Sequence, residues 1–202
     1  MNRRGLLLAA ASAAATSADA QQSVAVALGR AKVGKPPDGF SAARTGQGAP
    51  SAWSVAEDAS VLGGRVLTQT STDKTDYRFP LAIYDAVIAR DVEVTVRFKA
   101  VGGRIDRAGG IAVRLADADN YYVVRANALE DNVNFYHVVR GSRREIRGAS
   151  ASVASDQFTI GFNDKTLFSV VDRTFSNAGK VALWTKADSV THFDAMTIRT
   201  VA

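Results

Sequence analysis

Hydrophobic and polar positions alternate with a period of two along most of this chain. The alternation is clearest over residues 91–100, where apolar side chains take every second position and mostly charged or hydroxyl side chains take the others. Because successive side chains of a β-strand point to opposite faces, this period is typical of strands with one buried face. Beyond the N-terminal segment, no window has the 3.6-residue period of an amphipathic helix. The pattern therefore predicts an all-β protein.

The stretch from Ala108 to Val139 is the most regular part of the pattern. It reads as three strands joined by polar turns at 117–120 and 129–132. In the middle strand, the alternation over Tyr121–Asn127 separates an apolar face from a polar one. The polar face is predicted to collect four groups: Arg114, Tyr121, Arg125 and Asn127. Such a set predicts a binding surface rather than a catalytic motif.

Around ten short strands separated by polar turns predict two packed antiparallel sheets, that is, a β-sandwich. Asn163-Asp164 is a hairpin turn signal between two alternating segments. Pro80 interrupts the pattern over residues 77–82. Because proline cannot donate a backbone hydrogen bond, we expect this segment at a sheet edge or in a loop.

The first twenty residues have the features of an export signal. Arg3 and Arg4 precede a short apolar run over 6–15, and Ala18-Asp-Ala20 fits the small-x-small rule for cleavage before Gln21. The arginine pair also resembles a twin-arginine signal, which implies export after folding. The apolar run is too short to span a bilayer. We therefore expect a periplasmic or secreted protein with no stable membrane insertion after cleavage.

Composition narrows the function classes further. The chain has 202 residues, a formal net charge of +5 and no cysteine, which excludes disulfides and thiolate chemistry. This length suits a single domain, and we divide the chain into a signal peptide (1–20), an N-terminal lead-in that is irregular or an edge strand (21–50) and the sandwich (51–202). Basic residues are mixed with acids except at Arg140–Arg147, which we interpret as a solvated hairpin end. We expect no nucleic-acid partner.

Several segments resemble a known bacterial family. They are Gly109-Gly-Ile111, Asp119-Asn-Tyr-Tyr122, residues 125–132, Asp172-x-Thr-Phe175, residues 179–189 and Phe193-Asp194. Together they resemble the 3-keto-disaccharide hydrolase-type domain of the concanavalin A-like lectin/glucanase group, over roughly residues 50–200. The resemblance implies a jelly-roll β-sandwich with a carbohydrate partner, either as a glycoside hydrolase or as a LamG-like binding module.

One segment departs from that family pattern. Members of the group usually place an extra strand, opening with a Trp, between the positions of Gly141 and Phe158. Here Gly148–Asp156 reads GASASVASD. We therefore expect a missing or degraded strand at this sheet edge.

The resemblance also implies that the concave face of one sheet holds the sugar. A sugar offers hydroxyls to polar groups and an apolar C–H face to an aromatic ring. The residues expected to supply both kinds of group are Arg114, Tyr121, Arg125, Asn127, Trp184 and Lys186. The alternative is that Trp184 packs under a loop while the arginines lie on a solvated face.

Candidates for catalysis are fewer. Glycoside hydrolysis normally needs two carboxylates at a defined separation, and the Glu-x-Asp-x-x-Glu signature of laminarinase-type glucanases is absent from the sequence. Acids in turns, moreover, usually shape the turn. Asp188, His192 and Asp194 are the strongest catalytic candidates, because they place acids and a general base near Trp184 in the sequence. The alternative is that His192 simply sits on a strand.

Cleavage of a keto-sugar could follow another route, in which a base abstracts a proton beside the carbonyl. By analogy with the fold, His192 is the candidate base, and Lys186 or Arg125 would stabilise the oxyanion. An enzyme predicts an acid or histidine beside Trp184, whereas a lectin-like module predicts the same cleft without a poised base. A structural or protein-interaction module predicts a flat concave face filled by its own side chains, and no pocket.

No resident cofactor is expected. Asp117-x-Asp-Asn120 could offer oxygen ligands to calcium, but it lacks the ligand count of a defined calcium loop. The sequence has no Gly-x-Ser-x-Gly elbow, phosphate-binding glycine loop or HExxH motif, so serine-elbow acyl transfer, P-loop and zincin chemistry have no support.

Overall fold

The computed structural model describes residues 22–28, 31–146 and 156–201. The expected signal peptide (1–20) and nearly all of the degraded segment (148–156) lie outside these ranges. No helix long and apolar enough to cross a membrane is found among the described residues. The strands are β1 (Ser23–Val26), β2 (Phe40–Gly46), β3 (Trp53–Glu57), β4 (Arg65–Gln69), β5 (Arg78–Ala89), β6 (Val92–Gly102), β7 (Ala108–Asp117), β8 (Asn120–Asn127), β9 (Asn132–Val139), β10 (Ser142–Glu145), β11 (Gln157–Phe162), β12 (Lys165–Val171), β13 (Gly179–Thr185) and β14 (Val190–Thr200).

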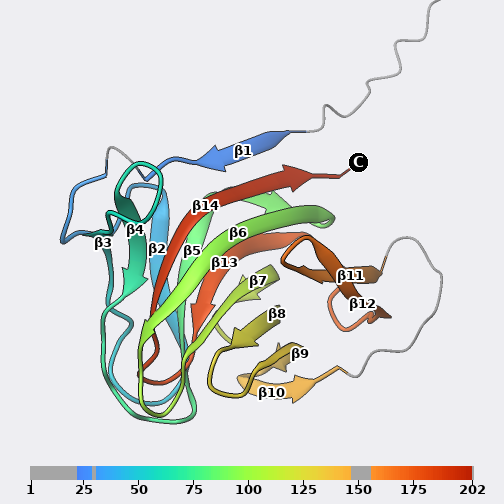
Figure 1. Cartoon of the computed structure of the whole chain (residues 1–202). Helices are drawn as coiled ribbons and strands as arrows, with labels where there is room; N and C mark the ends of the chain where they lie inside the picture. Colours follow the sequence, from blue (N-terminus) through green and yellow to red (C-terminus); the bar gives the residue numbers. More distant parts are fainter. Residues whose placement is uncertain (1–21, 29–30, 147–155, 202) are drawn as a thin grey trace, which may run out of the picture.

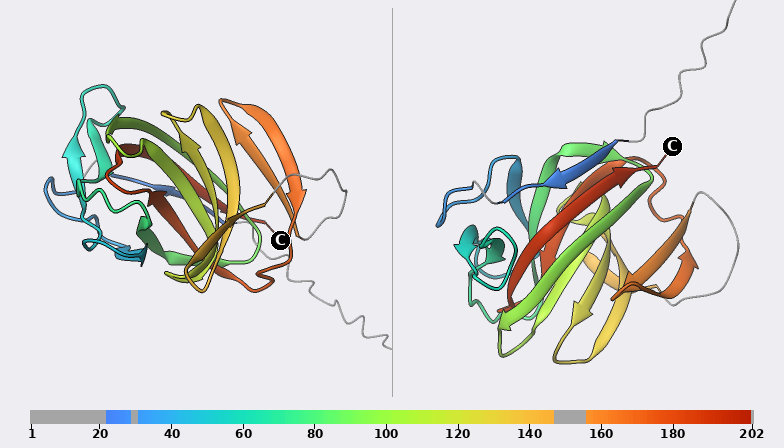
Figure 2. Two further views of the ribbon diagram at one scale, coloured as in Figure 1. Left: turned by 90° about the horizontal axis from the view of Figure 1, so that it is seen from below. Right: turned by 45° about the horizontal axis from the view of Figure 1, so that its top comes forward.

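Most of these strands form two antiparallel sheets, which Figures 1 and 2 show as curved layers. In the five-stranded sheet, β14 pairs with β6 on one side and with β1 and β4 on the other, and β4 pairs with β3. The seven-stranded sheet has the order β10–β9–β8–β7–β13–β5–β2. β11 and β12 form a separate hairpin. The predicted two-sheet β-sandwich is confirmed.

The main hydrophobic core lies between the two sheets. Leu183 of β13 packs there with Phe193 of β14. Because side chains alternate along a strand, Trp184 then points to the outer face of the seven-stranded sheet. By the same rule, His192 points to the outer face of the five-stranded sheet. These two outer faces lie on opposite sides of the sandwich.

A second hydrophobic cluster forms where the wider sheet extends past the narrower one. There the β11–β12 hairpin covers the inner face of β8 and β9, beside the end of the sandwich in Figure 1. Tyr122 and Phe135 of the sheet pack against Ile160 and Val170 of the hairpin. The inner face of the seven-stranded sheet is thus covered by two separate elements, β6 with its neighbours and the hairpin.

Residues 21–50 contribute two edge strands to the sandwich. β1 pairs with β14 and β2 pairs with β5, so the folded unit begins before residue 51. β5 is an interior strand, and the expected edge or loop position of Pro80 is therefore wrong for the strand as a whole. However, the pairing of β13 with β5 ends at Leu81, so Pro80 has only β2 as a paired neighbour.

Candidate ligand-binding cleft

The outer face of the seven-stranded sheet is closed by its own side chains. Trp184 has an exposed fraction of 0%, stacks on Phe79 with 5.3 Å between ring centroids, and donates from Nε1 to the Tyr121 hydroxyl at 3.2 Å. Tyr121 is also fully buried, and burial raises its pKa to about 12. Sequence parity thus places Trp184 and Tyr121 on one face correctly, but neither ring is open to a ligand.

Arg143 of the edge strand β10 completes this closure. Its guanidinium lies 4.6 Å from the ring centroid of Phe79, 4.7 Å from that of Tyr136 and 5.8 Å from that of Trp184. Five strand spacings separate β10 from β5, which in a flat sheet would be about 24 Å. The sheet therefore curls tightly enough for its outer face to pack against itself. This is the filled concave face that the structural alternative predicts.

The other polar residues expected on this face have partners within the protein. Arg125 is almost fully buried and pairs with Glu130 at 2.5 Å. Asn127 accepts the Leu129 backbone N–H at 3.0 Å, which shapes the β8–β9 turn. Lys186 pairs with two carboxylates, those of Asp76 at 2.7 Å and Asp106 at 2.9 Å. Burial lowers the pKa of Lys186, but these two carboxylates outweigh it and raise the pKa overall.

Arg114 does not share this face, contrary to the expectation from parity. The β7–β8 register shifts between Val113 and Asp117, and Arg114 has a φ of 47°. This bulge turns its side chain to the inner side, where it donates to the Phe175 carbonyl at 2.7 Å and pairs with Asp91 at 3.0 Å. A Cβ on Gly179 would lie 2.4 Å from the Arg114 carbonyl carbon, so glycine lets β13 pass the bulge.

The three catalytic candidates are not brought together with Trp184. His192 lies on the opposite outer face and its Nδ1 is 2.7 Å from Asp58. The Lys99 ammonium, 2.8 Å from the same carboxylate, holds the pKa of Asp58 well below its usual range. Asp194 accepts a hydrogen bond of 2.9 Å from Arg97 Nε.

Asp188 has a different set of partners. Its carboxylate accepts the backbone N–H groups of residues 104–106, with shortest distances of 2.8 to 3.1 Å. Asp188 thus caps the loop between β6 and β7. Each candidate acid or base is engaged in a separate contact, and no shared catalytic centre results.

The calcium candidate is a turn in the structure. Asp117 accepts the Asp119 backbone N–H at 2.7 Å and the Asn120 side-chain amide at 2.9 and 3.0 Å. Across the described ranges, no three His, Cys, Asp or Glu residues are grouped in a way that could hold a metal ion.

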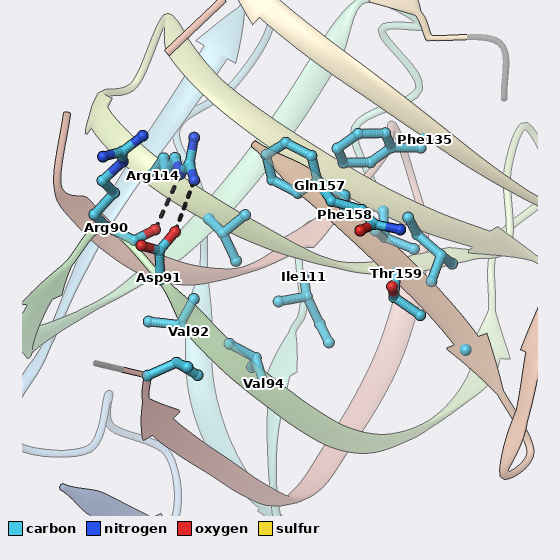
Figure 3. Close-up of a pocket in the computed structure, with 15 residues that line it drawn as sticks. Arg90, Asp91, Val92, Val94, Ile111, Arg114, Phe135, Gln157, Phe158 and Thr159 are labelled. Atoms are coloured by element: carbon cyan, nitrogen blue, oxygen red, sulfur yellow. Dashed lines mark hydrogen bonds and ion pairs between the residues drawn. The ribbon is translucent and has the colours of Figure 1, made fainter. Parts of the chain in front are cut away.

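A cleft of about 530 Å³ opens elsewhere, between β6, the inner face of the seven-stranded sheet and the β11–β12 hairpin. This volume is within the range of about 300 to 1,000 Å³ typical of small-molecule sites. Figure 3 shows the residues that line it. Its walls are mainly apolar, from Val92, Val94, Ile111, Val113, Val124, Phe135, Phe158, Ile160 and Val201.

Charged groups gather at one end of this cleft, where Arg90, Asp91 and Arg114 lie together in Figure 3. We call this the charged end, and include Asp156, which pairs with Arg90 at 3.2 Å and lies 3.5 Å from Arg114. Burial raises the pKa of Asp156, but hydrogen bonds from Arg90 and Arg173 outweigh it and lower the pKa overall. The charged end thus joins Arg90 and Arg114 to two carboxylates, and Arg173 is a further partner of Asp156 at 3.2 Å.

The hairpin forms a polar rim on another side of the cleft. Gln157 and Thr159 are exposed on β11, while Phe158 between them packs inward against Tyr122 with 4.6 Å between ring centroids. The Arg114 guanidinium lies 5.2 Å from the Phe158 ring centroid, which ties the charged end to the hairpin. The cleft therefore combines ionic groups, an amide, a hydroxyl and aromatic and aliphatic walls.

Comparison with known proteins supports the fold. No family model matches this sequence, and no curated protein matches it. The resemblance to the 3-keto-disaccharide hydrolase-type domain is therefore not confirmed. A solved structure, the carbohydrate-binding module CBM66 from Bacillus subtilis, superposes with a TM-score of 0.57 at 20% sequence identity. The match covers 80% of this chain and 96% of that one, so the two share the β-sandwich architecture.

Proposed function

We propose that this protein is a carbohydrate-binding β-sandwich that recognises a sugar in the cleft and does not hydrolyse it. The observation that carries the proposal is the charged end of the cleft, where donors and acceptors of both signs border an apolar wall. The shared architecture with a carbohydrate-binding module supports it. The proposed site differs from the concave face expected from the sequence, because that face is filled.

The chemistry of the charged end suits a sugar. Sugar hydroxyls both donate and accept, so they can bridge a guanidinium and a carboxylate that are already near one another. The side chains of Arg90 and Asp91 are 42% and 41% exposed, so a ligand can reach them from solvent. The C–H face of the sugar ring would then rest on the apolar wall that begins at Val92.

We propose binding without hydrolysis because no described residue at the cleft is placed as a general acid. A glycosidase needs one carboxyl group that is protonated at its working pH. Asp156 has a lowered pKa and is bound by arginines, and Asp91 is paired with Arg114. The alternative base, His192, lies on the outer face of the other sheet and is held by Asp58.

Sugar binding can be tested by calorimetry on a panel of monosaccharides, disaccharides and their 3-keto forms. Because Arg90 loses its charge-assisted hydrogen bonds to the ligand, we expect Arg90→Gln to weaken binding about tenfold. Arg104→Gln is the matched control, since Arg104 is exposed and lies away from the cleft. Absence of binding to every sugar by the folded protein would contradict the proposal, as would equal affinities in the two variants.

Export belongs to the same proposal, as an expectation from the N-terminal sequence. Cleavage after Ala20 would release a chain beginning at Gln21, two residues before β1. N-terminal sequencing of the protein recovered from periplasm or culture medium should therefore read from Gln21. Recovery of the protein only from the cytoplasm, with residues 1–20 intact, would remove export from the proposal.

A further inference from the structure

The apolar part of the cleft extends well beyond what a sugar ring uses. Nine lining residues are aliphatic or aromatic, from both sheets and from the hairpin. A hydroxyl placed against them would lose its hydrogen bonds to water without a replacement, which is unfavourable. A sugar alone therefore occupies the charged end and leaves this apolar space to be filled by something else.

Polar and apolar groups are segregated along the cleft rather than mixed. Along β6 the lining changes from Asp91 to Val92 and then Val94, moving away from the charged end in Figure 3. Along β7 the lining changes in the same sense, from Arg114 to Ile111, which lies away from the charged end in Figure 3. Two strands of different sheets thus form one gradient from ionic to apolar. The matching ligand has a polar head and an apolar tail.

The ion pairs at the charged end select the kind of head. Asp91 is paired with Arg114, and Asp156 is paired with Arg90, Arg114 and Arg173, so each guanidinium group there already has a carboxylate partner. A free carboxylate or phosphate head would compete with Asp91 and Asp156 for the same guanidinium groups. A neutral head with many hydroxyls can instead bind to both signs without breaking these pairs.

From this arrangement we infer that the natural ligand class is a glycoside with an apolar aglycone. The sugar lies at the charged end, and an alkyl or aryl aglycone extends between β6, β7 and the hairpin, towards Val94 and Ile111. The inference rests on the proposed carbohydrate function and adds the part of the ligand that the apolar walls recognise.

A series of alkyl glucosides from methyl to octyl, titrated below their micelle concentrations, tests the inference. Each buried methylene contributes about 0.8 kcal/mol, so we expect affinity to rise about three- to fourfold per added methylene until the cleft is full. Val94→Phe should fill the apolar space and flatten the series, so that the ratio of octyl to methyl glucoside affinity falls. Val101→Phe is the matched control, on the same strand but exposed and outside the cleft.

Each outcome separates this inference from the proposed function. Affinity that rises along the series, and no longer rises in Val94→Phe, supports both the proposed function and this inference. If Val94→Phe does not fold, the series on the unaltered protein alone tests the inference. A flat series with measurable binding of the methyl glucoside overturns the inference and leaves the proposed function intact. Equal binding of alkyl ethers of oligoethylene glycol also overturns it, because the sugar is then irrelevant. No binding of any glycoside overturns both.

Discussion

Replacing Trp184 with alanine is expected to lower the free energy of unfolding by about 3 to 5 kcal/mol, the usual cost of deleting a large buried aromatic side chain. The ring is fully buried, stacks on Phe79 and bonds to the Tyr121 hydroxyl. Its removal would also leave the Arg143 guanidinium over a cavity. Urea unfolding followed by circular dichroism measures the change.

The same variant distinguishes a structural from a sugar-binding role for Trp184. Because the ring is enclosed, we expect sugar affinity at a temperature where the variant is folded to equal that of the unaltered protein. Trp184→Phe is the matched control, since it keeps an aromatic ring in the stack and should retain most of the stability. A Trp184→Ala variant that is folded and yet no longer binds sugar would show that the outer face is the binding site.

The alternation of side chains predicts local geometry well in this protein. It correctly predicts the all-β class and the strands within residues 91–100 and 108–139. It also correctly predicts that Tyr121 and Trp184 lie on the same face. It does not show what covers that face. The cover is Arg143, brought over Phe79 by the curl of a seven-stranded sheet, and curl depends on the whole sheet rather than on any local pattern.

Arg114 illustrates a second limit. Parity is inverted by a single extra residue, so one bulge moves every following side chain to the other face. The bulge at Arg114 is accommodated because Gly179, distant in the sequence, has no Cβ to collide with it. A sequence read one strand at a time cannot reveal that pairing.

The cleft itself could not be predicted for a related reason. Most of its lining comes from residues 90–94, 111–114 and 157–161, which lie at the start of β6, in β7 and in β11. None of these segments contains a recognisable motif. The cleft exists because the wider sheet extends past the narrower one and the hairpin covers only part of the difference.

The position of Asp188 near Trp184 and His192 in the sequence predicts a catalytic acid, but its contacts in the structure give it another role. Its carboxylate accepts three consecutive backbone N–H groups, of Arg104, Ile105 and Asp106, and its side chain is buried. These three N–H groups would face an amide instead of a carboxylate in Asp188→Asn. We therefore expect this variant to lose about 2 to 4 kcal/mol of unfolding free energy at pH 7.

The pH dependence of that loss identifies its cause. Burial raises the pKa of the Asp188 carboxyl, but the three backbone N–H donors outweigh burial and lower the pKa overall. A carboxyl with a depressed pKa stabilises the fold above its unfolded pKa of about 3.9, and this contribution is lost as pH falls through the folded pKa. The difference between the unaltered protein and Asp188→Asn should therefore be largest near neutral pH and shrink below about pH 4.

Urea unfolding of both proteins at several pH values between 7 and 3 measures this difference directly. Because all other titrating groups are common to both proteins, their contributions cancel in the comparison. Asp117→Asn is the matched control, since Asp117 is an exposed acid that caps a turn with one backbone donor and should cost much less. A difference that stays constant with pH would mean that packing, rather than the charge of Asp188, stabilises the loop between β6 and β7.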